Sequence, residues 1–131
     1  MNAKQWLGRA RFIDRELKAL KREKQKTLDD LTKITQSYES DGAQMTKDPH
    51  KLDRIAEYTG LIEQKEAELM DTKRQILETI MKLQDGKQRS VLFEYYIEGK
   101  KWEEVAVDLH YSYMHVTRIH GYALTEVQKM L

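Results

Sequence analysis

The sequence contains no cysteine, one proline and six glycines in 131 residues. Without cysteine the chain can form neither a disulfide nor a thiolate metal site, which fits a reducing cytoplasm. Few prolines and glycines, together with 34% charged residues, favour long solvent-exposed helices over a fold built on a sheet. We therefore expect an all-α protein.

Long apolar runs are also missing. No stretch approaches the roughly 20 apolar residues that a membrane-spanning helix needs, and the first residues lack the apolar core of a signal peptide. The formal charge of +1 and the pI of about 7.9 indicate no particular partner. We expect a soluble, cytoplasmic protein without membrane contacts.

Motifs for catalysis and for cofactors are absent as well. No nucleophile stands with a histidine and an acid in a known arrangement, and there is no glycine-rich phosphate loop. His115 and His120 are five residues apart, which on a helix is a rotation of about 500°, or about 140° net, so they face different ways. We expect no enzymatic activity, no cofactor and no metal site.

The first 86 residues carry two heptad-like patterns. The first pattern consists of Trp6, Ala10, Ile13, Leu17, Leu20, Lys24, Thr27, Leu31, Ile34 and Tyr38. The second pattern consists of Leu52, Ile55, Thr59, Ile62, Glu66, Leu69, Lys73, Ile76, Ile80 and Leu83. Steps of three and four place each set on one side of a helix, so the patterns predict helices over about residues 3–38 and 49–84.

Turn and cap signals separate these helices. Asp41-Gly42 predicts a turn, and Asp48-Pro49 predicts a helix start, because proline at the first helical position gives up an N–H that has no partner. Gly86 predicts the end of the second helix, as its C′ residue. We expect residues 1–86 to form a long antiparallel coiled-coil helical hairpin in which Lys24 meets Glu66.

Residues 87–131 show the spacing of three shorter helices. Their apolar sets are Val91, Leu92, Tyr95 and Tyr96; Trp102, Val105, Ala106 and Leu109; and Val116, Ile119, Ala123, Leu124 and Val127. Gly99 ends the first of them, because glycine readily adopts positive φ. The turn His110-Tyr111-Ser112 precedes the third, whose free amides the Ser112 hydroxyl can cap. Small Ala106 permits a close helix crossing, so the segment predicts a helix-turn-helix.

The third helix would present four side chains outward, Tyr113, Met114, Thr117 and Arg118. In a helix-turn-helix, the residues at the start of the recognition helix reach base edges in the major groove. These four are therefore the predicted base contacts.

This segment resembles region 4 of bacterial sigma factors and, more closely, the C-terminal domain of phage and prophage late-gene transcription regulators of the ArpU and RinA kind. The resemblance is carried by Val91-Leu92, Tyr95-Tyr96, Glu98-Gly99, Trp102-Glu103-Glu104-Val105-Ala106, Leu109, Tyr111-Ser112-Tyr113, Val116, Arg118-Ile119-His120-Gly121 and Ala123-Leu124. It implies transcriptional control through binding of double-stranded DNA, with phosphate contacts from Ser112, Lys100 and Lys101.

Basic residues are concentrated at the other end of the chain. Residues 1–26 contain nine Lys/Arg against three Asp/Glu, whereas residues 85–131 contain six against seven. Arg9, Arg11 and Arg15 are therefore predicted to contact phosphates beside the site. A solvated helix face that binds nothing is the alternative interpretation of this basic run.

Two further functions are compatible with the sequence. The family pattern commonly has basic residues where this chain has Met114 and Tyr122, which favours an adaptor that binds RNA polymerase or another regulator without DNA. A phage DNA-packaging subunit would also combine a helix-turn-helix with a helical hairpin, in the opposite order along the chain. In the leading hypothesis the hairpin mediates homo-oligomerisation, most simply as a dimer, or binds a partner.

Overall fold

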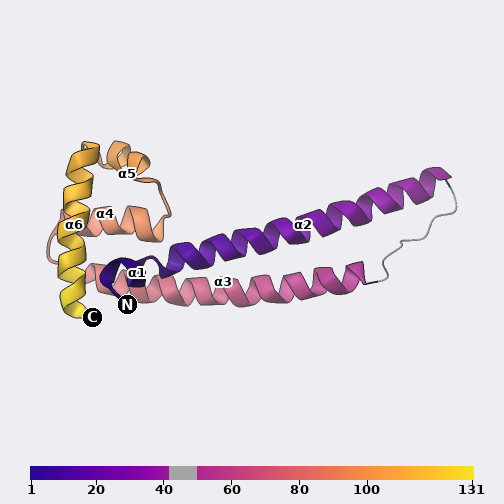
Figure 1. Ribbon diagram of the computed structural model, residues 1–131, viewed down its shortest axis with the longest axis horizontal. Coiled ribbons are helices and arrows are strands. Elements are labelled where there is room, and N and C mark those ends of the chain that lie inside the picture. Colours follow the sequence, from indigo (N-terminus) through magenta and orange to yellow (C-terminus); the bar gives the residue numbers. More distant parts are fainter. Residues whose placement is uncertain (42–49) are drawn as a thin grey trace. The chain divides into compact units, whose positions relative to one another are not determined.

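The computed structural model describes the backbone of residues 1–41 and 50–131, and the side chains of residues 1–33 and 50–131. These parts are helical and contain no strand, which confirms the all-α class. The helices are α1 (Ala3–Leu7), α2 (Arg9–Asp41), α3 (Lys51–Met81), α4 (Gly86–Leu92), the π-helix η1 (Phe93–Ile97), α5 (Trp102–Leu109) and α6 (Tyr113–Met130) (Figure 1). Of the predicted turn at Asp41-Gly42, Asp41 is the last residue of α2, and Gly42 lies outside the described residues, as does the predicted helix start at Asp48-Pro49.

The chain divides into two compact units. The first unit contains Met1–Ile13 and Leu69–Leu131, and the second contains Asp14–Glu68. The first unit thus combines the start of the chain with all of the C-terminal helices. The boundary expected between residues 86 and 87 lies inside it.

The predicted continuous helix over residues 3–38 is wrong near its start, because the helix is interrupted at Gly8. Helix α1 begins with a capping box, in which Asn2 Oδ1 accepts a hydrogen bond from the Gln5 amide (2.8 Å) and Gln5 Oε1 accepts one from the Asn2 amide (3.0 Å). Gly8 ends α1 with ψ near −6°. A Cβ atom at this position would lie 3.1 Å from the Lys4 carbonyl oxygen, so the break suits a residue without a side chain. Helix α2 then extends to Asp41, beyond the predicted end.

The expected role of Gly86 is also wrong. Helix α3 ends at Met81 rather than at residue 84, and Gly86 is the first residue of α4. The reason is Asp85, whose carboxylate accepts hydrogen bonds from the amides of Lys87 (2.8 Å) and Gln88 (3.4 Å) and so caps α4. The guanidinium of Arg89 donates to the carbonyl oxygen of Leu83 at 2.6 Å, which holds the connection between α3 and α4.

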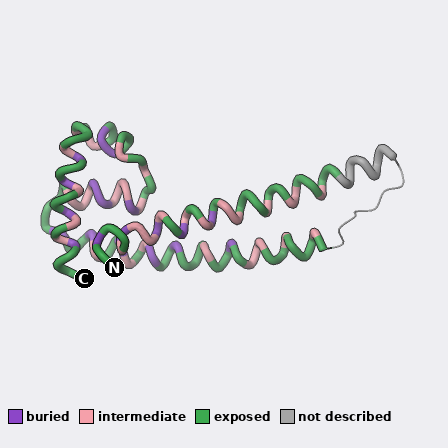
Figure 2. The backbone as a smooth tube through the Cα atoms, in the orientation of Figure 1, coloured by how far each residue is buried: buried purple, intermediate pink, exposed green. Residues whose placement is uncertain are grey.

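The core of the first unit surrounds α6, which packs against α1, α4 and α5. Figure 2 shows buried segments on each of these helices. The largest fully buried side chains are Leu7, Ile76, Ile80, Val91, Leu92, Val105, Val116 and Val127. The amide of Ala3 donates to Oε1 of Gln128 at 2.7 Å, so the start of the chain is tied to the end of α6.

In the second unit, α2 and α3 are joined by charged side chains at their margins. Lys65 pairs with Glu16 at 3.1 Å, and Lys21 pairs with Glu66 at 3.4 Å. The predicted contact of Lys24 with Glu66 is therefore replaced by one with Lys21, one helical turn earlier. The cause is the pairing register of the two helices, which the sequence patterns define only to within about a turn.

Candidate nucleic-acid interface

The turn between α5 and α6 has the local structure that its residues favour. His110 adopts left-handed geometry with φ 60°, and the Tyr111 amide donates to the Ala106 carbonyl oxygen at 3.0 Å, which closes α5. The Ser112 hydroxyl then accepts a hydrogen bond from the His115 amide at 3.1 Å. The predicted cap at Ser112 is confirmed, and α6 starts at the expected residue.

Helix α6 has one buried side. Val116, Ile119, Ala123 and Val127 are buried, as predicted, whereas Leu124 is only partly buried. Val116 and Ile119 belong to a cluster with buried Val91, Val105 and Ala106. Because these residues come from α4, α5 and α6, the cluster fixes the direction in which the opposite side of α6 faces.

The four predicted base contacts all lie on the exposed part of α6. Tyr113 is 52% exposed and Met114 is 67% exposed, and Thr117 and Arg118 are exposed too. The Thr117 hydroxyl donates to the Tyr113 carbonyl oxygen at 2.9 Å, so its proton is already used. Tyr122, one turn beyond Arg118, is 67% exposed. From Tyr113 to Tyr122, α6 therefore exposes polar, aromatic and apolar side chains.

Arg11, predicted to contact phosphate, lies against the aromatic residues of the first unit. Its guanidinium carbon is 4.1 Å from the centre of the Tyr95 ring, and Nη1 donates to the carbonyl oxygens of Tyr95 (2.9 Å) and Lys100 (3.4 Å). The Tyr95 ring in turn stacks on Trp102, with centroids 3.7 Å apart. Arg11 thus acts as a packing residue that joins α2 to η1 and to the segment before α5.

Arg9 and Lys100 also have partners within the protein. Nε of Arg9 donates to the Trp6 carbonyl oxygen (3.0 Å), and Nη2 donates to Gln75 (3.2 Å). The ammonium group of Lys100 lies 2.6 Å from a Glu94 oxygen and 2.7 Å from an Asp108 oxygen. The hydrogen bonds to Asp108 and Glu94 raise the pKa of Lys100 well above its usual value. The charge of Lys100 is thus neutralised by two carboxylates, and the guanidinium of Arg9 is held by neutral acceptors.

The remaining predicted phosphate contacts differ in position. Ser112 and Lys101 are exposed at the starts of α6 and α5, in the first unit. Arg15 is exposed too, but it belongs to the second unit. The structure therefore brings Ser112 and Lys101 into the same unit as the exposed side of α6.

The partners of His120, which lie within the first unit, were not predicted from the sequence. Its Nε2 is hydrogen-bonded to the Tyr96 hydroxyl at 2.7 Å, and its ring lies 4.4 Å from that of Trp102. Burial, with a smaller contribution from the charge of Lys4, lowers the pKa of His120 to about 4. Burial likewise raises the pKa of Tyr96 far above its usual value. The one sequence signal for the partial burial of His120 is its position directly after Ile119, a residue of the buried side of α6.

No helix in the described parts of the chain is both long enough and apolar enough to cross a membrane. Comparisons of the chain with protein-family models, with curated proteins and with solved structures find no match.

Proposed function

We propose that this chain is a sequence-specific DNA-binding transcription regulator of the phage and prophage kind, in which α5 and α6 act as a helix-turn-helix. One observation carries the proposal. Tyr113, Met114, Thr117 and Arg118 are all exposed at the start of α6: the last three face away from buried Val116 and Ile119, and Tyr113 lies at the edge of that exposed side. A helix held in this way by its buried side can enter the major groove with its first turns.

Each of the four side chains offers a different kind of contact. Arg118 can donate two hydrogen bonds to N7 and O6 of a guanine, which is the commonest specific contact in the major groove. Met114 can pack against a thymine methyl group. Thr117 offers a methyl group and a hydroxyl oxygen that can still accept, since its proton is bound to the Tyr113 carbonyl oxygen. The ring of Tyr113 can pack against a base, and its hydroxyl can donate a hydrogen bond to a nearby phosphate.

The proposed phosphate contacts are fewer than the sequence suggested. Ser112 and Lys101 stay in the set because they are exposed in the first unit, whereas Arg15 is left out because it is exposed in the second unit. Lys100 is left out because two carboxylates hold its ammonium group, and Arg9 and Arg11 are left out because they bind carbonyl oxygens and pack on rings. A small number of phosphate contacts predicts a shallow dependence of affinity on salt.

The long helices α2 and α3 complete the proposal. We assign to them an antiparallel coiled-coil hairpin that associates with a second copy of the chain or binds a partner such as RNA polymerase. Association of two copies would present two recognition helices to two half-sites, which raises affinity without new contacts on either module.

A second candidate function is favoured by the apolar character of part of the α6 surface. Met114 and Tyr122 are each 67% exposed, where a DNA-binding face would gain more from cations. Exposed apolar and aromatic side chains are typical of the centres of protein interfaces. An adaptor that binds a polypeptide through this side of α6 is therefore the alternative.

The decisive experiment is selection of duplex DNA from a random pool by the purified protein, followed by affinity measurements on the selected duplex and on a scrambled one. Arg118→Ala should weaken binding to the selected duplex by about 1–3 kcal/mol and binding to the scrambled duplex much less. Arg74→Ala is the matched control, because Arg74 is an exposed arginine of α3 whose charge is paired with Asp71 and Glu78.

The two functions predict different results. Enrichment of one sequence, with loss of that preference in Arg118→Ala and not in Arg74→Ala, supports the regulator. Failure to enrich any duplex, even at low salt, rejects DNA readout and leaves the adaptor as the better hypothesis.

A further inference from the structure

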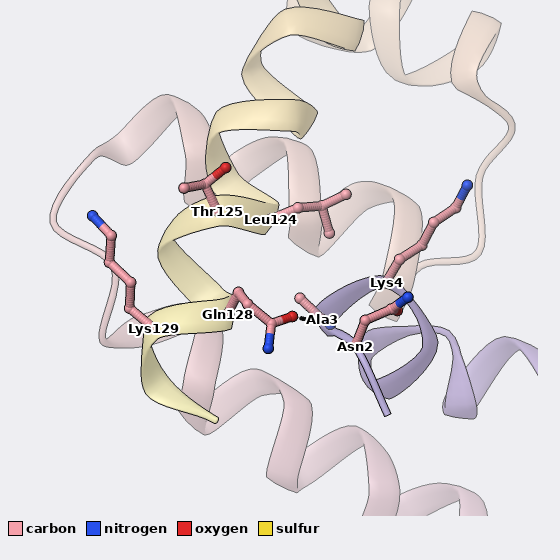
Figure 3. Close-up of a pocket in the computed structure, with 7 residues that line it drawn as sticks. All are labelled: Asn2, Ala3, Lys4, Leu124, Thr125, Gln128 and Lys129. Atoms are coloured by element: carbon pink, nitrogen blue, oxygen red, sulfur yellow. Dashed lines mark hydrogen bonds between the residues drawn. The ribbon is translucent and has the colours of Figure 1, made fainter.

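A groove lies between the start of α1 and the last turns of α6, within the first unit. Asn2, Ala3 and Lys4 line it from one side, and Leu124, Thr125, Gln128 and Lys129 line it from the other. Figure 3 shows Lys4 and Lys129 at opposite edges, with the Ala3 to Gln128 hydrogen bond between them. The floor thus holds apolar Ala3 and Leu124, and each edge ends in an ammonium group.

This groove continues the exposed side of α6 on which Arg118 lies. Thr125 and Lys129 follow Arg118 by seven and eleven residues, which are rotations of about 20° to either side of it on an α-helix. The corresponding rises are roughly 10 Å and 17 Å. If Arg118 reaches a base edge, the groove therefore lies about one major-groove width farther along the helix, where the sugar-phosphate backbone passes.

The charges of the groove suit a phosphodiester. No carboxylate lines it, and Lys4 is exposed and makes no ion pair within the described side chains. Lys129 is paired with Glu126 at 3.0 Å, but both side chains are largely exposed, so the pair exchanges easily for a phosphate. The apolar floor offers contact to a deoxyribose between two phosphates.

We propose that this groove binds the sugar-phosphate backbone of the DNA that α6 reads, with Lys4 and Lys129 each contacting a phosphate. The inference rests on the proposed function and adds to it a contact from the N-terminal segment. Basic residues near the N-terminus were expected to touch phosphates, and Lys4 takes that role in place of Arg9 and Arg11. The contact also gives a reason for α1 to pack on α6, because the packing brings Lys4 to the recognition helix.

The test is the salt dependence of duplex binding by wild-type protein, Lys4→Ala, Lys129→Ala and the double variant. Each lost phosphate contact should lower the slope of log affinity against log salt by about 0.9, and should weaken binding roughly fivefold at about 0.15 M salt. The loss should be equal on selected and scrambled duplexes, because a phosphate contact carries no sequence information. Lys82→Ala is the control, since Lys82 is an exposed lysine of the same unit outside the groove.

The outcomes separate the two proposals. A wild-type slope in the double variant, with sequence preference intact, overturns the groove contact and leaves the regulator standing. A reduced slope in Lys82→Ala equal to that of Lys4→Ala also overturns it, because the effect would then be one of net charge. Absence of duplex binding by the wild-type protein overturns both. Circular dichroism of each variant verifies that these exposed substitutions leave the helices intact.

Discussion

Eight large apolar side chains of the first unit are almost completely buried, whereas Leu17 and Ile62 of the second unit are 5% and 9% exposed. The first unit also contains a stack of Arg11, Tyr95 and Trp102 and the buried pair of Tyr96 and His120. Between the two helices of the second unit, the ion pairs of Lys21 with Glu66 and of Lys65 with Glu16 join partly exposed side chains.

The difference in burial between the two units follows from the number of helices that pack together in each. In the first unit α6 is packed by three other helices, so side chains from several directions exclude water. Two helices alone bury only a narrow strip, and solvent reaches the charged residues on both sides of it. We therefore expect the first unit to owe its stability to packing, and the second to lose little from any single polar substitution.

The strongest test of this difference is Leu7→Ala. Leu7 is 0% exposed in the first unit, so the truncation should lower the free energy of unfolding by about 2–5 kcal/mol. Both tryptophans of the chain, Trp6 and Trp102, belong to this unit, so their fluorescence in a urea titration reports its unfolding.

The control for Leu7→Ala is Leu61→Ala, in the second unit. Leu61 is 46% exposed, so the tryptophan transition should remain nearly unchanged. Equal shifts in the two variants would contradict the assignment of α1 to the core of the first unit.

A smaller effect is expected from pH, again confined to the first unit. The pKa of His120 is lowered to about 4 in the folded protein, against about 6.5 in an unfolded chain. His120 is neutral in both states well above pH 6.5, and as the pH falls toward 4 only the unfolded state gains the proton. The contribution of His120 to the free energy of unfolding is thus fully present above about pH 6.5 and is lost as the pH falls toward 4. The loss is at most about 3 kcal/mol, and the partial exposure of the ring reduces it.

The measurement is urea unfolding at pH 7 and at pH 4.5, followed by tryptophan fluorescence. His120→Gln keeps a polar side chain that does not titrate, so it should lose less stability between the two pH values than the wild-type protein. Carboxylates titrate in this range in both proteins, and the comparison removes their contribution. Identical losses would mean that His120 is not buried as described.

Much of the C-terminal fold could be predicted because its signals are local. Gly99 adopts the positive φ expected of it, and Ser112 caps α6 by accepting a hydrogen bond from the amide of His115, three residues later. Gly8 and Gly86 were misjudged for a different reason. An apolar pattern reports which side of a helix is buried, and it runs through Gly8 without showing that the helix is interrupted there. At Gly86 the deciding group is the Asp85 carboxylate, which starts a helix.

The candidate site could be predicted where it depends on one helix and not where it depends on tertiary contacts. The exposure of Met114, Thr117 and Arg118 follows from their positions on the side of α6 away from Val116 and Ile119, and that of Tyr113 from its place in the first turn. The state of Arg11 does not, since its partners Tyr95 and Lys100 are 84 and 89 residues away. The position of Lys4 beside α6 could not be predicted from the sequence either, because it depends on the packing of α1 on α6.

The smallest expected effect concerns the pairing of the second unit, and it tests the register directly. Lys21 and Glu66 are 3.4 Å apart with side chains 54% and 49% exposed, so a double-mutant cycle with alanine should give a coupling of about 0.2–1 kcal/mol that fades at high salt. The matched cycle of Lys24 with Glu66 should give a value near zero. Helix content by circular dichroism is the readout, because the second unit contains no tryptophan. A larger coupling for Lys24 would restore the register expected from the heptad patterns, with the two helices shifted by one turn.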